Sequence, residues 1–145
     1  MDYKGYEILG LNDEEIAHFY EEEKDKILLK ENEYLAIENN NKEIIDKFCF
    51  QNGQLRPIKS FKINSDYYGT IKPRNLQQSF LFDMLQDKVT TIKVVSGRFG
   101  SGKTIAMVSS ALEAIQKGIF QKIVWVRNNI EVKNSAPIGA LPGLI

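Results

Sequence analysis

Residues 94–104 read VVSGRFGSGKT, and this stretch decides how the second half of the chain folds. It begins with an apolar pair, holds three glycines within six residues, and ends in a lysine and a threonine. Gly97 to Thr104 fits the pattern G-x-x-x-x-G-K-[ST], in which a glycine-rich loop joins a strand to a helix. The flanks agree, because 91–95 is strand-like and 104–117 is a helical run with Gly118 placed to end it.

Each residue type in this stretch has a physical role in holding phosphate. Glycines allow positive φ values that turn successive backbone N–H groups toward anionic oxygens, and the N-terminus of the following helix adds partial positive charge. We expect Lys103 to reach the β- and γ-phosphates as the catalytic lysine, and the Thr104 hydroxyl to bind Mg²⁺. A merely flexible turn is the disfavoured alternative. The predicted nucleotide-binding residues of the loop are Gly97, Arg98, Phe99, Gly100, Ser101, Gly102, Lys103 and Thr104.

A second apolar segment follows the helical run. Residues 123–126 (IVWV) are continuous and apolar, as a buried parallel strand would be. Strand, glycine loop, helix and strand together make one βαβ unit. The sequence therefore predicts an α/β fold.

The first part of the chain has a different character. Asn12 and Glu15 have the spacing of a capping box at a helix start. Short strands are expected at 27–29, 34–37 and 44–50, and Asn52-Gly53 indicates a two-residue hairpin turn. The returning strand, 55–58, contains Pro57 and is therefore expected at an edge. Residues 27–58 are predicted to form a small antiparallel β-meander.

Between these two parts lies a segment with little periodicity. We interpret 61–70 as a linker between an accessory region, 1–60, and the first part of a truncated P-loop domain, 71–145. A helix is predicted over 76–86, after Pro73, with Leu76, Phe80, Met84 and Leu85 available for burial.

Charge divides the chain in the same way. Residues 1–60 hold 8 basic and 14 acidic side chains, whereas residues 61–145 hold 11 basic and 5 acidic ones. A basic second part suits a polyanionic ligand, although charges scattered over solvated faces explain the balance equally well. Cys49 is expected to be a buried hydrophobe, and His18 has no cysteines around it for a zinc site. No apolar run approaches the roughly 20 residues of a membrane span, so we expect a cytoplasmic protein without membrane contact.

Several stretches together resemble one protein family. Residues 71–87 (IKPRNLQQSFLFDMLQD), the glycine loop, residues 111–127 (ALEAIQKGIFQKIVWVR) and residues 138–143 (IGALPG) are similar to the PhoH family. Residues 1–60 resemble, more loosely, the region that precedes the ATPase core in longer members, which begin with a PIN ribonuclease domain. The resemblance implies a RecA-like ATPase core related to superfamily 1 helicases, using ATP and Mg²⁺ and acting on RNA.

The resemblance also assigns roles outside the loop. Asn75 and Gln78 match an Asn-x-x-Gln element in which the glutamine contacts the adenine edge. The alternative, which is compatible with the first, is a capping box with Asn75 as the cap. Arg127 stands where the family has Arg-Pro, and is either near phosphate or nucleic acid or a solvated residue at a strand end.

One expected feature does not occur in the sequence. No Asp-Glu pair follows the glycine loop, so the Walker B motif would lie beyond Ile145. We therefore interpret the 145 residues as a fragment that binds nucleotide weakly and turns it over negligibly. Two alternatives are a small-molecule kinase that uses the same loop, and a non-catalytic RNA-binding or docking module. The sequence leaves open whether the chain forms a homo-oligomer.

Overall fold

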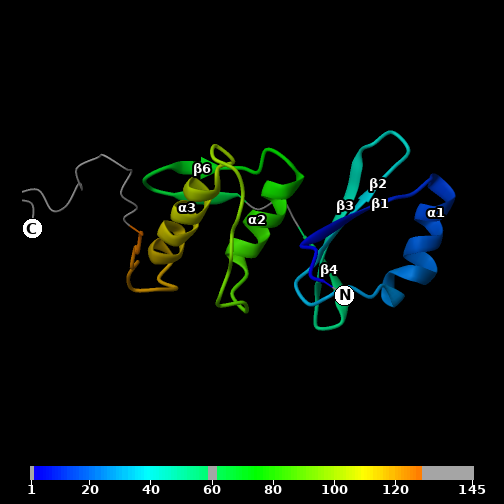
Figure 1. Cartoon of the computed structure of the whole chain (residues 1–145), viewed down its shortest axis with the longest axis horizontal. Coiled ribbons are helices and arrows are strands. Elements are labelled where there is room, and N and C mark those ends of the chain that lie inside the picture. The colour runs from blue at the N-terminus through cyan, green and yellow to red at the C-terminus, as the bar shows by residue number, and fades with distance from the viewer. Residues whose placement is uncertain (1, 59–61, 129–145) are drawn as a thin grey trace, which may run out of the picture.

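The computed structural model describes residues 2–58 and 62–128, which form an α/β arrangement of two sheets and three α-helices (Figure 1). The first sheet has the order β1-β2-β3-β4, with β1 parallel to β2 and the other neighbours antiparallel. The second sheet is a hairpin of β5 and β6. The strands are β1 (Tyr6–Gly10), β2 (Tyr34–Glu38), β3 (Ile44–Gln51), β4 (Gln54–Pro57), β5 (Ile63–Ser65) and β6 (Gly69–Ile71), and the α-helices are α1 (Asp13–His18), α2 (Leu76–Gln86) and α3 (Lys103–Gln116).

The hairpin between β3 and β4 forms as predicted. Asn52 and Gly53 have φ values of 54° and 75°, and Gln51 pairs with Gln54 across them. Positive φ at both central residues gives the turn a twist that matches the flanking strands. Pro57 lies on β4 at the edge of the sheet, where a missing N–H removes no hydrogen bond from an interior ladder.

The sheet differs from the predicted meander at its other edge. Residues 27–29 do not form a strand, and β1, which we did not predict, pairs with β2 instead. Ile27 and Leu29 pack beside Phe19 against the sheet face. They therefore contribute to the core without pairing in the sheet. A short apolar run in the sequence is equally compatible with a strand and with an irregular segment that packs on a sheet.

The four-stranded sheet is buried on both faces. Leu35, Ile37 and Phe48 pack on one face around Phe19, which follows α1 in a π-helical turn, Phe19–Glu23. Tyr34 and Ala36, with Cys49, pack on the other face against Phe80 of α2. Alternate residues of a strand point to opposite faces, which explains this division. Figure 1 shows the sheet between α1 and α2.

A buried ion pair fixes α2 against the sheet. The Asp83 carboxylate, of which only 2% of the side chain is exposed, accepts two hydrogen bonds from Arg56, at 3.0 and 2.8 Å. It also accepts one from the Tyr34 hydroxyl at 2.9 Å. Burial together with the neighbouring carboxylate raises the pKa of Tyr34, which keeps the phenol protonated as a donor. The sequence pattern gave no signal for Asp83, because it lies among apolar helix positions.

The segment that we expected to be a linker contains the second sheet. β5 and β6 pack against α2 and α3, with Ile63, Phe82 and Ala106 in one buried cluster. The Glu113 carboxylate of α3 accepts a hydrogen bond from the backbone N–H of Asn64 at 2.6 Å. The three-residue strands are too short to show a period, so their sequence looked irregular.

Neither predicted strand beside α3 forms. Residues 91–95 and 123–126 have no sheet partner, and Val94 and Val126 are 84% and 85% exposed. A parallel strand gains its stability from neighbouring strands and from helices on both faces. The βαβ unit is therefore not present among the described residues, and the RecA-like sheet stays a prediction.

The predicted helix ends agree closely with the structure. Asn12 Oδ1 accepts from the N–H of Glu15, whose carboxylate bonds the Asn12 amide side chain. At the end of α3, Gly118 has a φ of 72°, and the N–H groups of Gly118 and Ile119 bond the carbonyls of Ile115 and Ala114. This pattern is a Schellman motif. No helix among the described residues has the length and apolar character to span a membrane.

Replacing Asp83 with Ala tests the buried ion pair. We expect Asp83→Ala to lower the free energy of unfolding by about 1–3 kcal/mol, because it leaves the Tyr34 hydroxyl without its acceptor. The Arg56 guanidinium also loses its partner, but 39% of its side chain is exposed and water can solvate it. Urea denaturation measures the change. Glu7→Ala, which removes an exposed pair with Lys4, is the control and should cost less than about 1 kcal/mol. Equal effects of the two variants would refute the central role of Asp83.

Glu33 should make the stability depend on pH. Backbone N–H groups of Lys4 and Lys30 bond its carboxylate at 2.8 and 2.9 Å and lower its pKa. This contribution is complete above the unfolded-state pKa of about 4.3 and is lost as the pH falls through the lower folded-state pKa. Denaturation of Glu33→Gln and of the parent chain, followed from neutral pH to below the unfolded-state pKa of about 4.3, should show a stability difference that shrinks as the pH falls. An identical pH dependence of stability in the two chains would contradict this role of Glu33.

Candidate phosphate-binding site

The glycine loop leads directly into α3, as the sequence predicted. Gly102 is the N-cap of α3, with a φ of 82°, and has no side chain to cap the helix. The first N–H groups of α3 therefore receive no acceptor from the cap residue. A 14-residue helix with an uncapped N-terminus offers donors and partial positive charge to an anion.

The glycines are required for different reasons. Gly100 has open space around it but a φ of 77°, which L side chains rarely adopt. Gly97 is crowded instead, since a Cβ there would lie 3.1 Å from Lys103 Cδ and 3.3 Å from Ser101 Oγ. Gly100 therefore suits the loop through its positive φ, and Gly97 through the close approach of the Lys103 and Ser101 side chains.

Lys103 closes the loop on itself. Its ammonium group donates a hydrogen bond to the carbonyl oxygen of Gly97, six residues earlier. The N–H of Ser101 bonds the carbonyl of Arg98 at 3.3 Å. Arg98, Phe99 and Thr104 are exposed to solvent, as residues that contact a ligand in an open loop would be. Lys103 would have to exchange its carbonyl partner for phosphate.

Ser101 has an unsatisfied polar atom. Its Oγ is buried and has no hydrogen-bond partner among the described residues. Buried polar atoms in proteins nearly always have a partner, so an exception suggests a ligand or a water. This orphaned hydroxyl, the crowded Gly97 and the uncapped helix together fit a bound phosphate group.

The Asn-x-x-Gln element contacts this loop. Asn75 Oδ1 accepts from the N–H of Gln78 at 2.9 Å, which confirms Asn75 as the helix cap. Gln78 Oε1 accepts from the N–H of Arg74 at 2.7 Å, one residue before the position of a standard capping box. Gln78 Nε2 donates to the carbonyl of Ser101 at 3.1 Å. No pattern in the sequence predicts this contact between residues 23 positions apart.

The adenine role of Gln78 stays a prediction. Both ends of its amide bond main-chain groups of the protein, so contact with a base would require the exchange of one partner. Arg127 is exposed and does not lie on a strand.

Acidic groups are scarce around the loop. Glu113 is the one carboxylate between residues 103 and 128, and it is occupied by Asn64 N–H and by Lys117. Among residues 2–58 and 62–128, no three His, Cys, Asp or Glu side chains gather as a metal cluster would. The metal role of Thr104 stays a prediction.

Comparison with known proteins identifies the family of the chain. A family model described as PhoH-like protein matches residues 70–145. The chain belongs to the PhoH-like protein family.

One curated relative of this PhoH-like chain is Protein PhoH2 of Bacillus subtilis (strain 168), which is 29% identical over 87 residues. That alignment covers 59% of this chain and 19% of the relative, so the chain spans about a fifth of the length of the relative that it matches. No solved structure matches. The family match includes the IGALPG stretch, which lies outside the described residues, and begins after the four-stranded sheet.

The Gln78–Ser101 hydrogen bond should hold the loop of this PhoH-like chain in place. We expect Gln78→Ala to speed amide hydrogen exchange across residues 98–104 by about fivefold, because one hydrogen bond contributes roughly 1 kcal/mol. Gln77→Ala is the matched control, since Gln77 bonds the Tyr6 hydroxyl at 3.1 Å and not the loop. Hydrogen exchange with mass spectrometry measures both variants. An unchanged loop in Gln78→Ala would contradict the assignment.

Proposed function

We propose that this chain is the ATP-binding portion of a PhoH-type P-loop ATPase, which couples nucleotide turnover to RNA unwinding or remodelling in the full-length protein. The observation that carries the proposal is the loop at 97–102, which joins directly onto the uncapped N-terminus of α3. Family membership supports the ATPase class. The basic second part of the chain supports a polyanionic partner such as RNA.

The residues of the loop have separate tasks in this proposal. Main-chain N–H groups around Gly100 and Gly102, with the start of α3, bind phosphate oxygens. The Ser101 hydroxyl is the buried polar group that a ligand would satisfy. Lys103 leaves the Gly97 carbonyl and neutralises phosphate charge. Thr104 holds Mg²⁺, which would screen the charge between adjacent phosphates when bound.

We assign binding, and not efficient hydrolysis, to the described residues. ATP hydrolysis needs a group that positions the attacking water in addition to a phosphate cradle. Glu113 is the carboxylate nearest in sequence to the glycine loop. It is 7% exposed, and it accepts the Asn64 N–H bond that joins β5 to α3. The 145 residues are therefore expected to bind nucleotide with negligible turnover. A small-molecule kinase is disfavoured by the family match.

Lys103→Ala tests the phosphate assignment. We expect ATP affinity to fall by about 10–100-fold, because a hydrogen bond to a charged group contributes roughly 1.5–3 kcal/mol. Isothermal titration calorimetry with the whole chain measures the affinity. Lys88→Ala, which removes an exposed lysine outside the loop, should bind like the parent. Unchanged affinity in Lys103→Ala, with a native circular dichroism spectrum, would end the proposal.

Thr104→Val tests the metal assignment separately. The change keeps the branched shape of the side chain and removes its hydroxyl. We expect Mg²⁺ to strengthen ATP binding in the parent chain and to have a clearly smaller effect in the variant, while binding without metal stays the same. Calorimetric titrations of ATP in the presence of Mg²⁺ and of EDTA measure this effect in both chains. An equal Mg²⁺ effect in both chains would place the metal elsewhere.

A further inference from the structure

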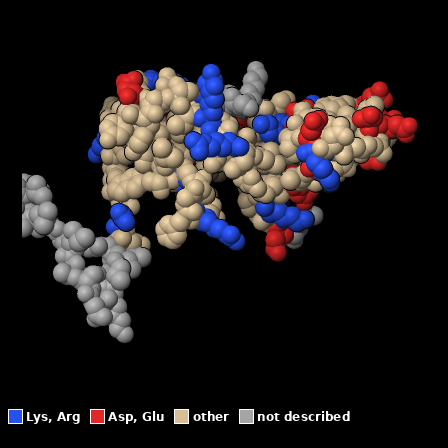
Figure 2. Space-filling model, turned by 90° about the horizontal axis from the view of Figure 1, so that it is seen from above, with Lys and Arg blue, Asp and Glu red and all other residues tan. Residues whose placement is uncertain are grey.

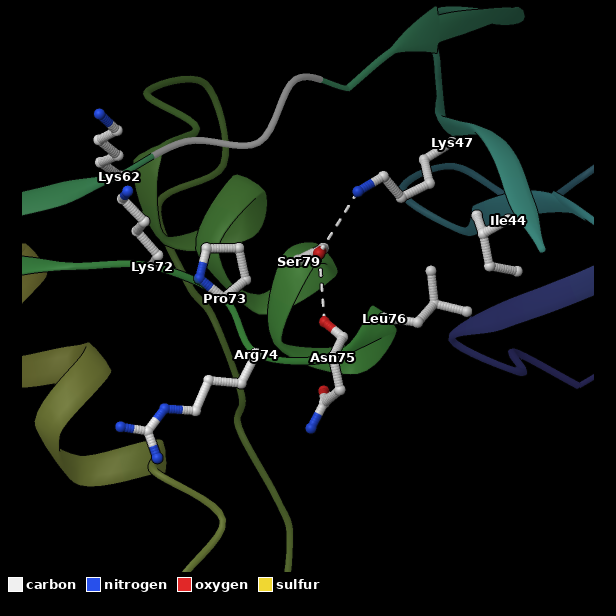
Figure 3. A pocket seen from close by; sticks show the side chains of 9 residues that line it. All are labelled: Ile44, Lys47, Lys62, Lys72, Pro73, Arg74, Asn75, Leu76 and Ser79. Atoms are coloured by element: carbon white, nitrogen blue, oxygen red, sulfur yellow. Dashed lines mark hydrogen bonds between the residues drawn. The ribbon is translucent and has the colours of Figure 1, made fainter.

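A basic pocket lies apart from the glycine loop. It has a volume of about 450 Å³ and opens where β3 meets the start of α2 (Figure 3). Four of its lining side chains are basic: Lys47 on β3, Lys62 before β5, and Lys72 and Arg74 between β6 and α2. Three separate segments of the chain therefore bring their cations to one opening.

The charge of this pocket is not balanced locally. None of the nine described residues that line it is acidic. Within residues 2–58 and 62–128, none of the four cations forms an ion pair with a carboxylate. Lys47 Nζ has a long contact of 3.4 Å with Ser79 Oγ, and Lys62, Lys72 and Arg74 are exposed. Like charges that are gathered without a counterion repel each other, and a bound anion would relieve that repulsion.

The pocket lies where the acidic part of the chain meets the basic part. The first 60 residues carry a net charge of −6, yet Lys47 from this acidic part lines the same pocket as three cations of the second part. Figure 2 shows most of the acidic side chains on that face toward the end formed by α1 and the four-stranded sheet, with basic side chains near the middle. The fold therefore concentrates positive charge at the junction of two regions of opposite net charge.

The arrangement suits an extended anion better than a small one. Figure 3 shows Lys47 on one side of the pocket, Lys62 and Lys72 on the opposite side, and Arg74 pointing away from both. The four cations are spread around the opening and do not converge on one point. Pro73 and Leu76 supply apolar surface between them. Spaced cations with apolar surface between them match the alternation of phosphate and sugar along a nucleic-acid strand.

We propose that this pocket binds the phosphodiester backbone of a single nucleic-acid strand. The inference deepens the proposed function by locating its nucleic-acid contact, and it rests on that function only for the coupling to ATP. Two hydrogen bonds of Gln78 on α2 connect the pocket to the glycine loop. Gln78 Oε1 accepts from the N–H of Arg74 at the pocket, and Gln78 Nε2 donates to the Ser101 carbonyl in the loop. A strand that displaces Arg74 would thus act on the loop through one side chain.

The test is binding of a fluorescein-labelled single-stranded 12-mer RNA to the whole chain, followed by fluorescence anisotropy over a range of salt concentrations. The variant is Lys62→Gln/Lys72→Gln, which removes two exposed cations without reversing their charge. We expect affinity at low salt to fall at least about tenfold. The slope of log affinity against log salt should become shallower by about 1.4, because each phosphate contact on a single strand contributes about 0.7. DNA of the same sequence should behave alike, since the contacts are to phosphate.

Two controls keep the proposal open to refutation. Lys26→Gln/Lys88→Gln makes the same change of net charge with two exposed lysines that do not line the pocket, and should leave the affinity within about twofold. An equal loss in this control would show that overall charge, and not the pocket, binds RNA. Lys103→Ala should retain RNA binding, and its loss would place the strand on the phosphate loop.

A further titration distinguishes this proposal from the proposed function. ATP affinity should be unchanged in Lys62→Gln/Lys72→Gln, and a parallel loss of ATP and RNA binding would assign the pocket to the nucleotide. Anionic vesicles that bind with the same dependence on Lys62 and Lys72, while RNA does not bind, would also overturn the assignment. Failure of ATP binding to respond to Lys103→Ala would instead refute the nucleotide site and leave the pocket standing.

Discussion

The buried carboxylate of Asp83 is the constraint on which the rest of the structure depends. It accepts two hydrogen bonds from Arg56 and one from Tyr34, so strands β2 and β4 are both tied to α2 through one group. A buried charge is tolerated only where its partners and hydrogen bonds are all in place. The ion pair therefore fixes how the four-stranded sheet and α2 face each other, which the apolar contacts of Phe80 alone would specify less sharply.

α2 connects this constraint to the candidate site. Asp83 lies near the middle of the helix and bonds the sheet, whereas Gln78, five residues earlier, bonds the glycine loop at Ser101. Five residues of helix span only about 7.5 Å. The first turn of α2 also borders the basic pocket, through Asn75 and Leu76. One short helix thus places the sheet, the glycine loop and the pocket relative to one another, although the family match begins after the sheet.

Local patterns and the antiparallel pairing of β2, β3 and β4 were predicted well, whereas the sheet partners of three other apolar runs were not. The turn at Asn52-Gly53, the cap at Asn75 and the stop at Gly118 follow from the backbone preferences of a few adjacent residues, so sequence alone was sufficient. The strands expected at 27–29, 91–95 and 123–126 failed for a common reason. An apolar run shows that a segment prefers burial, but pairing depends on which other segments reach it.

The sequence by itself determined the glycine loop at the start of α3, because its glycines, lysine and threonine act within eight consecutive residues and impose their geometry locally. It also determined the division of charge between the two parts of the chain. Only the tertiary structure decided that Gln78 bonds the loop, that Glu113 is occupied by β5, and that four cations from three segments share one pocket. These arrangements join residues that lie far apart in the chain, and their proximity is set by the packing of α2 and α3 against the two sheets.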